Sequence, residues 1–410
     1  MSSAVKSSFS RTGCSNSCRL GLRGASQRRV VVSRAVDVRC HSSPEQKDSF
    51  SASRRDLLSV GPLLASTYAL GLTSSPSAQA QVVAKQWEKV PLPISKETVL
   101  LDVGFDGTDP NHGFLLGTRQ TLLETKDGGK TWENREVPQA LDEGINYRFD
   151  SISFNGKEGW IVGKPAILLH STDGGETWER VPLSSKLPGS PVLITALPGE
   201  PGQAEMVTDQ GAIYVTSNAG YNWTAAVQET VDATLNRTVS SGISGASYYE
   251  GTFSSVRRSP TGDYVAVSSR GNFYMTWSPG DTFWFPHNRP TARRVQAMGW
   301  DPDNKLWLTN RGGGLLLANK PGIVDTGDFS SMSIESRGFG LLDVGYTTDG
   351  SRGFACGGSG SLFQSTDGGK SWKRIKETDD VAGNLYEVKF FDPKRGYILG
   401  NNSIILRYVA

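Results

Sequence analysis

The sequence predicts an all-β protein, a seven-bladed β-propeller that follows an N-terminal leader. Three observations lead to this prediction. A short motif recurs along the chain, its first copies are 46 and 45 residues apart, and short strand patterns surround each copy. Repeats of roughly 40 to 50 residues with four strands each are typical of propeller blades.

The motif is an Asp box, or BNR-like repeat. Clear copies run from Thr125 to Trp132, from Ser171 to Trp178 and from Ser365 to Trp372, and a weaker copy runs from Thr216 to Trp223. More degenerate copies are predicted at 276–284 and 318–322. The acid or amide caps backbone N–H groups of a tight hairpin, glycine supplies a positive φ, and tryptophan covers apolar surface. The residues predicted to have these structural roles are Asp127, Asp173, Asn218 and Asp367, with Trp132, Trp178, Trp223 and Trp372. A loop with one carboxylate is a poor Ca²⁺ site, so we expect no metal there.

Three strand patterns precede each box and one follows it, which predicts four-stranded antiparallel blades. The blades are expected near 98–137, 147–183, 191–230, 251–290, 292–335 and 339–377. Residues 385–410 supply only three strands of a seventh blade. The segment 86–92 matches 177–183 almost residue for residue, so we expect the N-terminal strand of the mature chain to complete this blade and remove exposed sheet edges. Residues 231–250 are predicted to form an insertion loop between blades three and four.

Residues 1–80 are predicted to be a two-part leader. Residues 1–50 have the Ser- and Arg-rich composition of a chloroplast transit peptide, with Asp37 as the only acid in the first 44 residues. Residues 51–80 have the pattern of a twin-arginine signal: Arg54 and Arg55 precede a short apolar segment, and Ala78 and Ala80 form an A-x-A cleavage site. The leader therefore predicts delivery to the thylakoid lumen and a mature propeller of residues 81–410.

Charge and cysteine usage disfavour several classes of protein. Of the 43 Lys+Arg and 41 Asp+Glu residues, 11 and 4 lie in 1–80, so the body has 32 basic and 37 acidic residues. A mildly acidic body argues against general nucleic-acid binding. Cys14, Cys18 and Cys40 lie in the leader, which leaves Cys356 alone and excludes an intrachain disulfide or a cysteine zinc site after processing. With only His112, His170 and His287 scattered through the body, we expect no metal or cofactor.

Propeller geometry predicts a cationic surface on one face. Asp-box turns join the third and fourth strands, so the turns between the second and third strands must lie on the opposite face, beside the connections between blades. The cations predicted there are Arg119, Lys164, Arg270 and Arg311 in turns, and Arg148, Arg289, Arg293, Arg294 and Arg337 in connections. Arg257 and Arg258 fall at the other end of an inner strand. The converging cations predict a local positive field that binds a partner, although ordinary solvated loop arginines remain the alternative.

The leader, the Asp-box blades and the N-terminal closure together resemble the family of chloroplast photosystem II stability/assembly factors and their cyanobacterial counterparts. The resemblance covers essentially the whole chain. It implies a non-catalytic factor that binds the newly made reaction-centre subunit D1 through an arginine-rich patch and helps it join its partner and cytochrome b559. It also implies that no cofactor is needed and that the protein lies peripherally on the lumenal side of the thylakoid membrane. We further expect a monomer.

Two other classes remain as alternatives. Asp boxes also occur in sialidases and other glycoside hydrolases, and 147–150 faintly resembles a segment that opens such enzymes, but no pair of catalytic carboxylates is identifiable. A pigment- or redox-binding protein is disfavoured because the body has one cysteine and no haem attachment motif.

Overall fold

The computed structural model describes residues 85–141, 144–227, 252–334, 336 and 340–410. Their strands form seven separate four-stranded sheets, all antiparallel, so the predicted number of blades is confirmed. No helix in these ranges is long and apolar enough to span a membrane. The leader 1–80 with Arg54, Arg55, Ala78 and Ala80, the insertion 231–250 and Arg337 lie outside the described residues.

Six blades each take four consecutive strands, ordered from the centre of the ring outwards. Blade one comprises β2 (Leu100–Phe105), β3 (Gly113–Gly117), β4 (Leu122–Thr125) and β5 (Glu133–Asn134). Blade two comprises β6 (Arg148–Asn155), β7 (Glu158–Lys164), β8 (Ile167–Ser171) and β9 (Glu179–Arg180), after the short 3-10 helix η1 (Pro138–Ala140). Blade three comprises β10 (Pro191–Ala196), β11 (Ala204–Thr208), β12 (Ile213–Thr216) and β13 (Thr224–Val227).

The next three blades repeat this order. Blade four comprises β14 (Phe253–Arg258), β15 (Tyr264–Ser268), β16 (Phe273–Trp277) and β17 (Phe285–Asn288). Blade five comprises β18 (Val295–Trp300), β19 (Lys305–Asn310), β20 (Leu315–Pro321) and β21 (Phe329–Ser331), with η2 (Thr326–Asp328) before the last strand. Blade six comprises β22 (Leu341–Tyr346), β23 (Gly353–Gly357), β24 (Leu362–Ser365) and β25 (Lys373–Ile375), with η3 (Gly358–Gly360) after β23.

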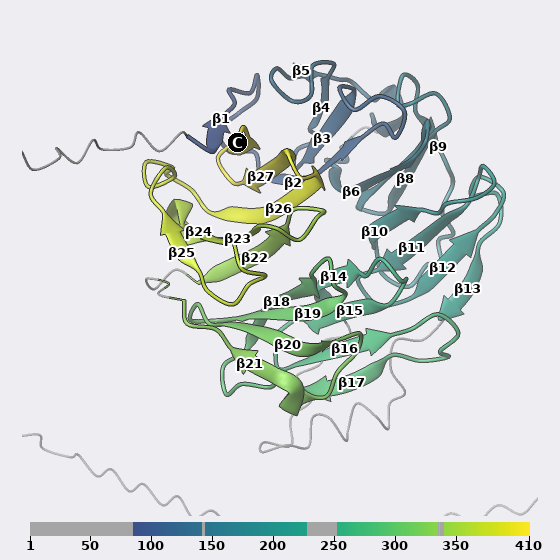
Figure 1. Cartoon of the computed structure of the whole chain (residues 1–410). Coiled ribbons are helices and arrows are strands. Elements are labelled where there is room, and N and C mark those ends of the chain that lie inside the picture. Colours follow the sequence, from purple (N-terminus) through teal and green to yellow (C-terminus); the bar gives the residue numbers. More distant parts are fainter. Residues whose placement is uncertain (1–84, 142–143, 228–251, 335, 337–339) are drawn as a thin grey trace, which may run out of the picture. The chain divides into compact units, whose positions relative to one another are not determined.

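Blade seven joins the two ends of the described chain. It comprises β26 (Leu385–Asp392), β27 (Arg395–Gly400), β28 (Ile405–Tyr408) and, as its outermost strand, β1 (Trp87–Lys89). β1 pairs antiparallel with β28, with Trp87 opposite Tyr408, and in Figure 1 it lies beside the C-terminus. One carboxylate oxygen of Glu377 accepts the backbone N–H groups of Gln86 at 2.8 Å and Trp87 at 3.1 Å. The predicted closure by an N-terminal strand is confirmed, and innermost strands contact their neighbours all the way around the ring.

The apolar cores lie between neighbouring blades, because each sheet buries both of its faces. Trp178 of the second Asp box packs edge-on against Phe114 of blade one, with ring centroids 5.6 Å apart. Gly175 of the same box has φ +92°, and a Cβ there would lie 2.4 Å from the Phe114 ring. Glycine therefore serves the turn twice, since it adopts a left-handed conformation and lets the box approach the preceding blade.

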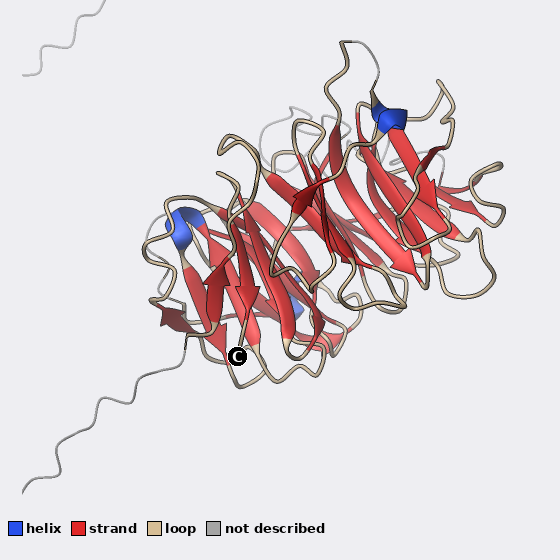
Figure 2. Ribbon diagram, turned by 90° about the horizontal axis from the view of Figure 1, so that it is seen from above, coloured by secondary structure: helices blue, strands red, loops and turns tan. Residues whose placement is uncertain are grey.

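The loops gather at the two ends of the strands (Figure 2). One end has the Asp-box turns, and we call it the Asp-box face. The other end has the turns between second and third strands and the connections between blades, and we call it the connection face. Each inner strand has a register shift within its first few residues, as between Leu100 and Asp102 of β2, so it has one extra residue close to the connection face.

Two local predictions differ from the structure. The predicted box at 318–322 is wrong, because residues 318–321 are part of strand β20. This strand pairs with β19 as far as Pro321, which lies opposite Lys305. This segment has neither a capping acid nor a glycine pair, so the strand continues where an Asp box would have formed a turn. The outer strand predicted at 177–182 is only two residues long, Glu179–Arg180, because the box itself uses the residues before it.

Candidate functional site

Eight of the nine predicted partner-binding cations lie within the described residues, and all eight are on the connection face. Arg119, Arg270 and Arg311 lie in turns between second and third strands, Lys164 ends β7, Arg148 begins β6, and Arg289, Arg293 and Arg294 lie between β17 and β18. The ninth, Arg337, falls in a gap between the described ranges.

Backbone hydrogen bonds hold the cations of blades four and five in one place. The N–H of Arg311 donates to the carbonyl of Arg294 at 2.8 Å, which ties the β19–β20 turn to the connection before β18. The guanidinium of Arg293 occupies the space that a Cβ at Gly312 would take. Glycine at this position, with φ +120°, therefore lets the side chain from one segment lie across the turn of the other.

Three of the predicted cations are ion-paired within the protein. Arg148 Nε lies 3.0 Å from Asp150, and Lys164 Nζ lies 3.1 Å from Asp209. Arg119 pairs with the exposed Glu97. Burial raises the pKa of Asp150, and the adjacent Arg148 opposes that shift. These cations are partly neutralised and offer less charge to a partner.

Four other cations of this face have no carboxylate partner in the part of the chain that the structure describes. Arg289, Arg293, Arg294 and Arg311 form no ion pair with any described residue, and we call these four the arginine surface. Three of them are exposed and Arg289 is half-buried. Arginine binds carboxylates in a bidentate geometry, so this surface is suited to an acidic segment.

The Asp boxes are hydrogen-bonded turns. Asp173 Oδ1 accepts the N–H of Thr177 at 3.0 Å, and its Oδ2 accepts the Thr177 hydroxyl at 2.6 Å. Partial burial opposes ionisation of Asp173, but these bonds and one from Ser171 outweigh it and lower its pKa to about 2. The same bonds recur at Asp127 and Asp367, and at Asn218 the amide oxygen accepts the N–H of Asn222. Because its oxygens are already engaged by the turn, the box is a structural element of the blades that contain it.

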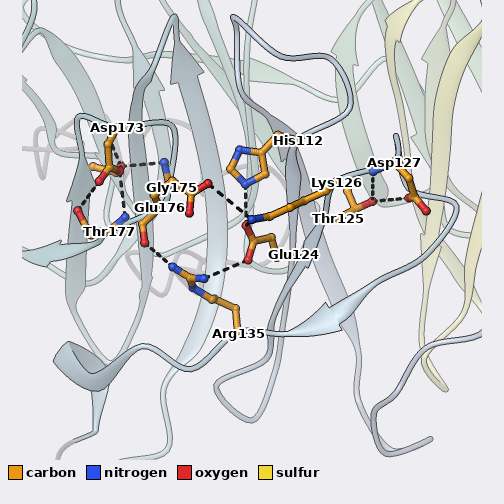
Figure 3. Close-up of polar contacts among 11 residues, drawn as sticks. His112, Glu124, Thr125, Lys126, Asp127, Arg135, Asp173, Gly175, Glu176 and Thr177 are labelled. Atoms are coloured by element: carbon orange, nitrogen blue, oxygen red, sulfur yellow. Dashed lines mark hydrogen bonds and ion pairs between the residues drawn. The ribbon is translucent and has the colours of Figure 1, made fainter.

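A cluster with metal-ligand chemistry lies between the first two boxes (Figure 3). His112 Nε2, Glu124 and Glu176 offer ligand atoms within 4.8 Å of one another. Lys126 Nζ lies 3.5 Å from Glu124 and 3.6 Å from Glu176, between the two carboxylates. Arg135 lies 3.2 Å from the second oxygen of Glu124. A metal ion would have to displace Lys126, and the arrangement acts as an ion network that joins blade one to blade two.

Sequence reasoning missed the charges that meet in the central channel. Arg257 and Arg258 are not part of the arginine surface, because both are ion-paired inside the ring. Arg257 meets Asp343 and Glu387, and Arg258 Nε lies 2.9 Å from Glu205. The missed signal was an acid within an apolar inner strand, at Asp102 and again at Asp343.

The family model and the curated relatives agree on one family. The family model described as "Photosynthesis system II assembly factor YCF48" matches residues 79–409. The chain is similar to "Photosystem II stability/assembly factor HCF136, chloroplastic" of Arabidopsis thaliana, at 57% identity over 81% of each chain.

Two solved structures are similar over the propeller. The structure "YCF48 from Cyanidioschyzon merolae" is 48% identical with a TM-score of 0.71, and covers 79% of this chain and 99% of its own. The structure "YCF48 bound to D1 peptide" is 42% identical with a TM-score of 0.69, and covers 80% of this chain and 96% of its own. Since the solved relatives consist almost wholly of the matched part, a propeller expressed without residues 1–80 is a suitable protein for experiments.

Proposed function

Because the chain belongs to the family of photosystem II assembly factors described as YCF48, we propose that it binds newly made D1 and promotes early assembly of the photosystem II reaction centre. In this role it is a non-catalytic binding protein. A relative of the same family, 42% identical to this chain, has been solved with a D1 peptide.

The observation that carries this proposal is the arginine surface. It offers four guanidinium groups that have no carboxylate partner among the described residues, on a face stabilised by backbone hydrogen bonds. Carboxylate groups of an extended lumenal segment of D1 would form ion pairs with these guanidinium groups. The finer parts of the proposal are that the D1 complex includes cytochrome b559, that the protein acts as a monomer, and that it works at the lumenal side of the thylakoid membrane after removal of residues 1–80.

The test is capture of D1 by purified residues 81–410, with charge reversal of the arginine surface. The variant carries Arg289→Glu, Arg293→Glu, Arg294→Glu and Arg311→Glu. The matched control reverses four lysines of the Asp-box face and outer rim that have no ion pair with a described residue: Lys130→Glu, Lys157→Glu, Lys370→Glu and Lys373→Glu. Both variants change the net charge equally, so a difference between them reports position.

We expect the arginine variant to lose capture and the lysine control to keep it. A charge-assisted hydrogen bond contributes about 1.5–3 kcal/mol. Loss of two such bonds should weaken binding by about 100-fold or more, because each tenfold change in affinity corresponds to about 1.4 kcal/mol. Capture by the unmodified protein should also weaken as salt rises, because exposed charges are screened.

The possible failures are distinguishable. If the unmodified propeller captures no D1 or D1 peptide, the proposed function is wrong. If both variants lose binding equally, the function stands but the arginine surface is not the site.

A further inference from the structure

Two cavities lie along the central channel, and both are lined by the same arginine. A cavity of about 600 Å³ lies toward the Asp-box face, and a second of about 450 Å³ lies toward the connection face. Arg257 of β14 lines both of them. The side chain of Arg257 therefore lies at the boundary between the two chambers.

Arg257 crosses from blade four to the other side of the ring. Its guanidinium donates to Glu387 Oε1 of blade seven at 3.0 Å and lies 3.2 Å from Asp343 Oδ1 of blade six. Both carboxylates are buried. The nearby charge of Asp343, followed by that of Glu387, raises the pKa of Arg257 above its usual range, so Arg257 is a permanent cation. This contact is a brace between blade four and two blades that are not its neighbours in the ring.

A second ion pair lies beside the brace. Lys389 Nζ of β26 lies 2.6 Å from Asp102 Oδ1 of blade one. The other oxygen of Asp102 accepts the N–H of Ile152 at 2.8 Å, and Asp343 Oδ2 accepts the N–H of Val388 at 2.9 Å. Asp102 and Asp343 are thus both anchored by backbone donors as well as by cations.

The charges of this cluster do not balance. Three carboxylates, Asp102, Asp343 and Glu387, face two cations, Arg257 and Lys389. The other charged residues that line the chamber on the connection face are already paired with each other: Arg148 with Asp150, and Lys164 with Asp209. The Cys356 thiol on the neighbouring β23 adds no charge, since burial raises its pKa well above the usual value. Among the described residues, one negative charge of this cluster remains without compensation.

Glu387 is the carboxylate that lacks a backbone donor among the hydrogen bonds of the described residues. Burial, followed by the charge of Asp102, raises the pKa of Glu387 from 4.5 to about 7. An acid with a raised pKa in the folded state binds a proton on folding. Stability from this site is therefore fully present below about pH 4.5 and is lost as the pH rises through about 7.

We propose that Glu387 is a proton-binding site that sets how firmly the ring is braced. When Glu387 is protonated, Arg257 with Asp343 and Lys389 with Asp102 form a balanced set of ion pairs across the channel. When Glu387 is ionised, the excess negative charge weakens the packing of blade seven against its neighbours. The propeller is thereby adapted to an acidic compartment and loosens as the pH rises.

The test compares purified residues 81–410 with the variant Glu387→Gln, which mimics the protonated carboxyl. The folding equilibrium constant is measured by urea unfolding, followed by tryptophan fluorescence, at pH 6 and pH 8. If folding takes up one proton at a group with a folded-state pKa near 7, the folding equilibrium constant of the wild type should fall about tenfold between pH 6 and pH 8. Glu387→Gln lacks this titrating group, so its folding equilibrium constant should fall about tenfold less than that of the wild type between pH 6 and pH 8. The variant should also be the more stable protein at pH 8.

A second measurement uses Cys356, which is fully buried and is the only cysteine of residues 81–410. At pH 8 a thiol reagent should label the wild type faster than Glu387→Gln, because the looser ring opens more often. The matched control is Glu205→Gln, whose buried carboxylate accepts from Arg258 at 2.9 Å and the Tyr264 hydroxyl at 2.6 Å. This control should retain the tenfold pH dependence of the wild type.

Three outcomes would overturn the proposal: a Glu387→Gln protein with the full pH dependence of the wild type, one that is labelled faster at pH 8, or one that fails to fold at pH 6. The last would mean that the ring needs the ionised carboxylate. No partner enters these measurements, so their outcome is independent of the proposed binding to D1.

Discussion

Replacement of Trp87 by alanine should test whether the N-terminal strand closes the ring. The Trp87 side chain is only 1% exposed and packs against Phe354, Phe390 and Tyr408, with ring centroids 5.1, 6.0 and 5.1 Å away. Truncation of a buried tryptophan costs about 3–5 kcal/mol, from lost transfer free energy and the cavity left behind. Because domains have only about 5–15 kcal/mol of net stability, this single change would remove a large part of it.

The assay is urea unfolding of residues 81–410, followed by far-UV circular dichroism. The matched control is Tyr221→Ala, since Tyr221 is an aromatic residue that is 88% exposed in an Asp box, and we expect it to cost under about 0.5 kcal/mol. A second variant, Glu377→Gln, keeps the ring of Trp87 but weakens the two hydrogen bonds that Glu377 accepts from the first residues of the strand. It should lower stability by less than Trp87→Ala. A loss below about 1 kcal/mol for Trp87→Ala would refute the closure argument, because the ring would then hold without this strand.

Two further predictions concern the boxes and the leader. Asp173→Ala should cost about 0.5–2 kcal/mol, as loss of a capping side chain does. Hydrogen bonds lower the pKa of Asp173 from 3.8 to about 2, so the wild type should lose its extra stability over Asp173→Ala as the pH falls from about 4 to about 2. The free energies of unfolding of the two proteins should therefore converge near pH 2. A difference in stability that does not change with pH would contradict the turn's dependence on an ionised carboxylate. In the leader, replacement of Arg54 and Arg55 by lysine should block delivery to the thylakoid lumen but leave import into the stroma intact, as measured by fractionation after chloroplast import. Normal lumenal delivery of that variant would show that the twin-arginine assignment is wrong.

The architecture was predictable because its signals are local and repeated. In each clear box, the acid, the glycine pair and the tryptophan lie within eight residues, and each performs its role inside one turn or against the preceding blade. The closure of blade seven followed from the similarity of 86–92 to 177–183, a repeat that ends at one terminus and resumes at the other. The prediction failed in blade five, where 318–322 has spacing that suggests a box but lacks the residues that turn the chain.

The site was predictable only as far as strand order determines it. Strand order places Lys164 and Arg311 on the same face, but it does not say which of them has an acidic partner. Lys164 is neutralised by Asp209 of blade three, and Arg119 by Glu97 in the segment before blade one. These partners come from other blades or connections, so only three-dimensional packing shows which cations lack a partner among the described residues.

The sequence could have predicted that charges meet in the central channel, but not which of them form pairs. Leu100–Gly104 and Leu341–Gly345 have the same sequence, Leu-Leu-Asp-Val-Gly, which places an acid at the same level of two inner strands. A carboxylate buried in an apolar strand needs a cation or a hydrogen-bond donor, since its desolvation is otherwise too costly. Blades four and seven place Arg257 and Lys389 two residues further along the equivalent strands, each just after a valine. Aligned blades could therefore have predicted that these charges meet in the channel. The identity of the pairs could not follow, because Arg257 finds Glu387 at a separation of 130 residues, and only the closed ring brings the two together.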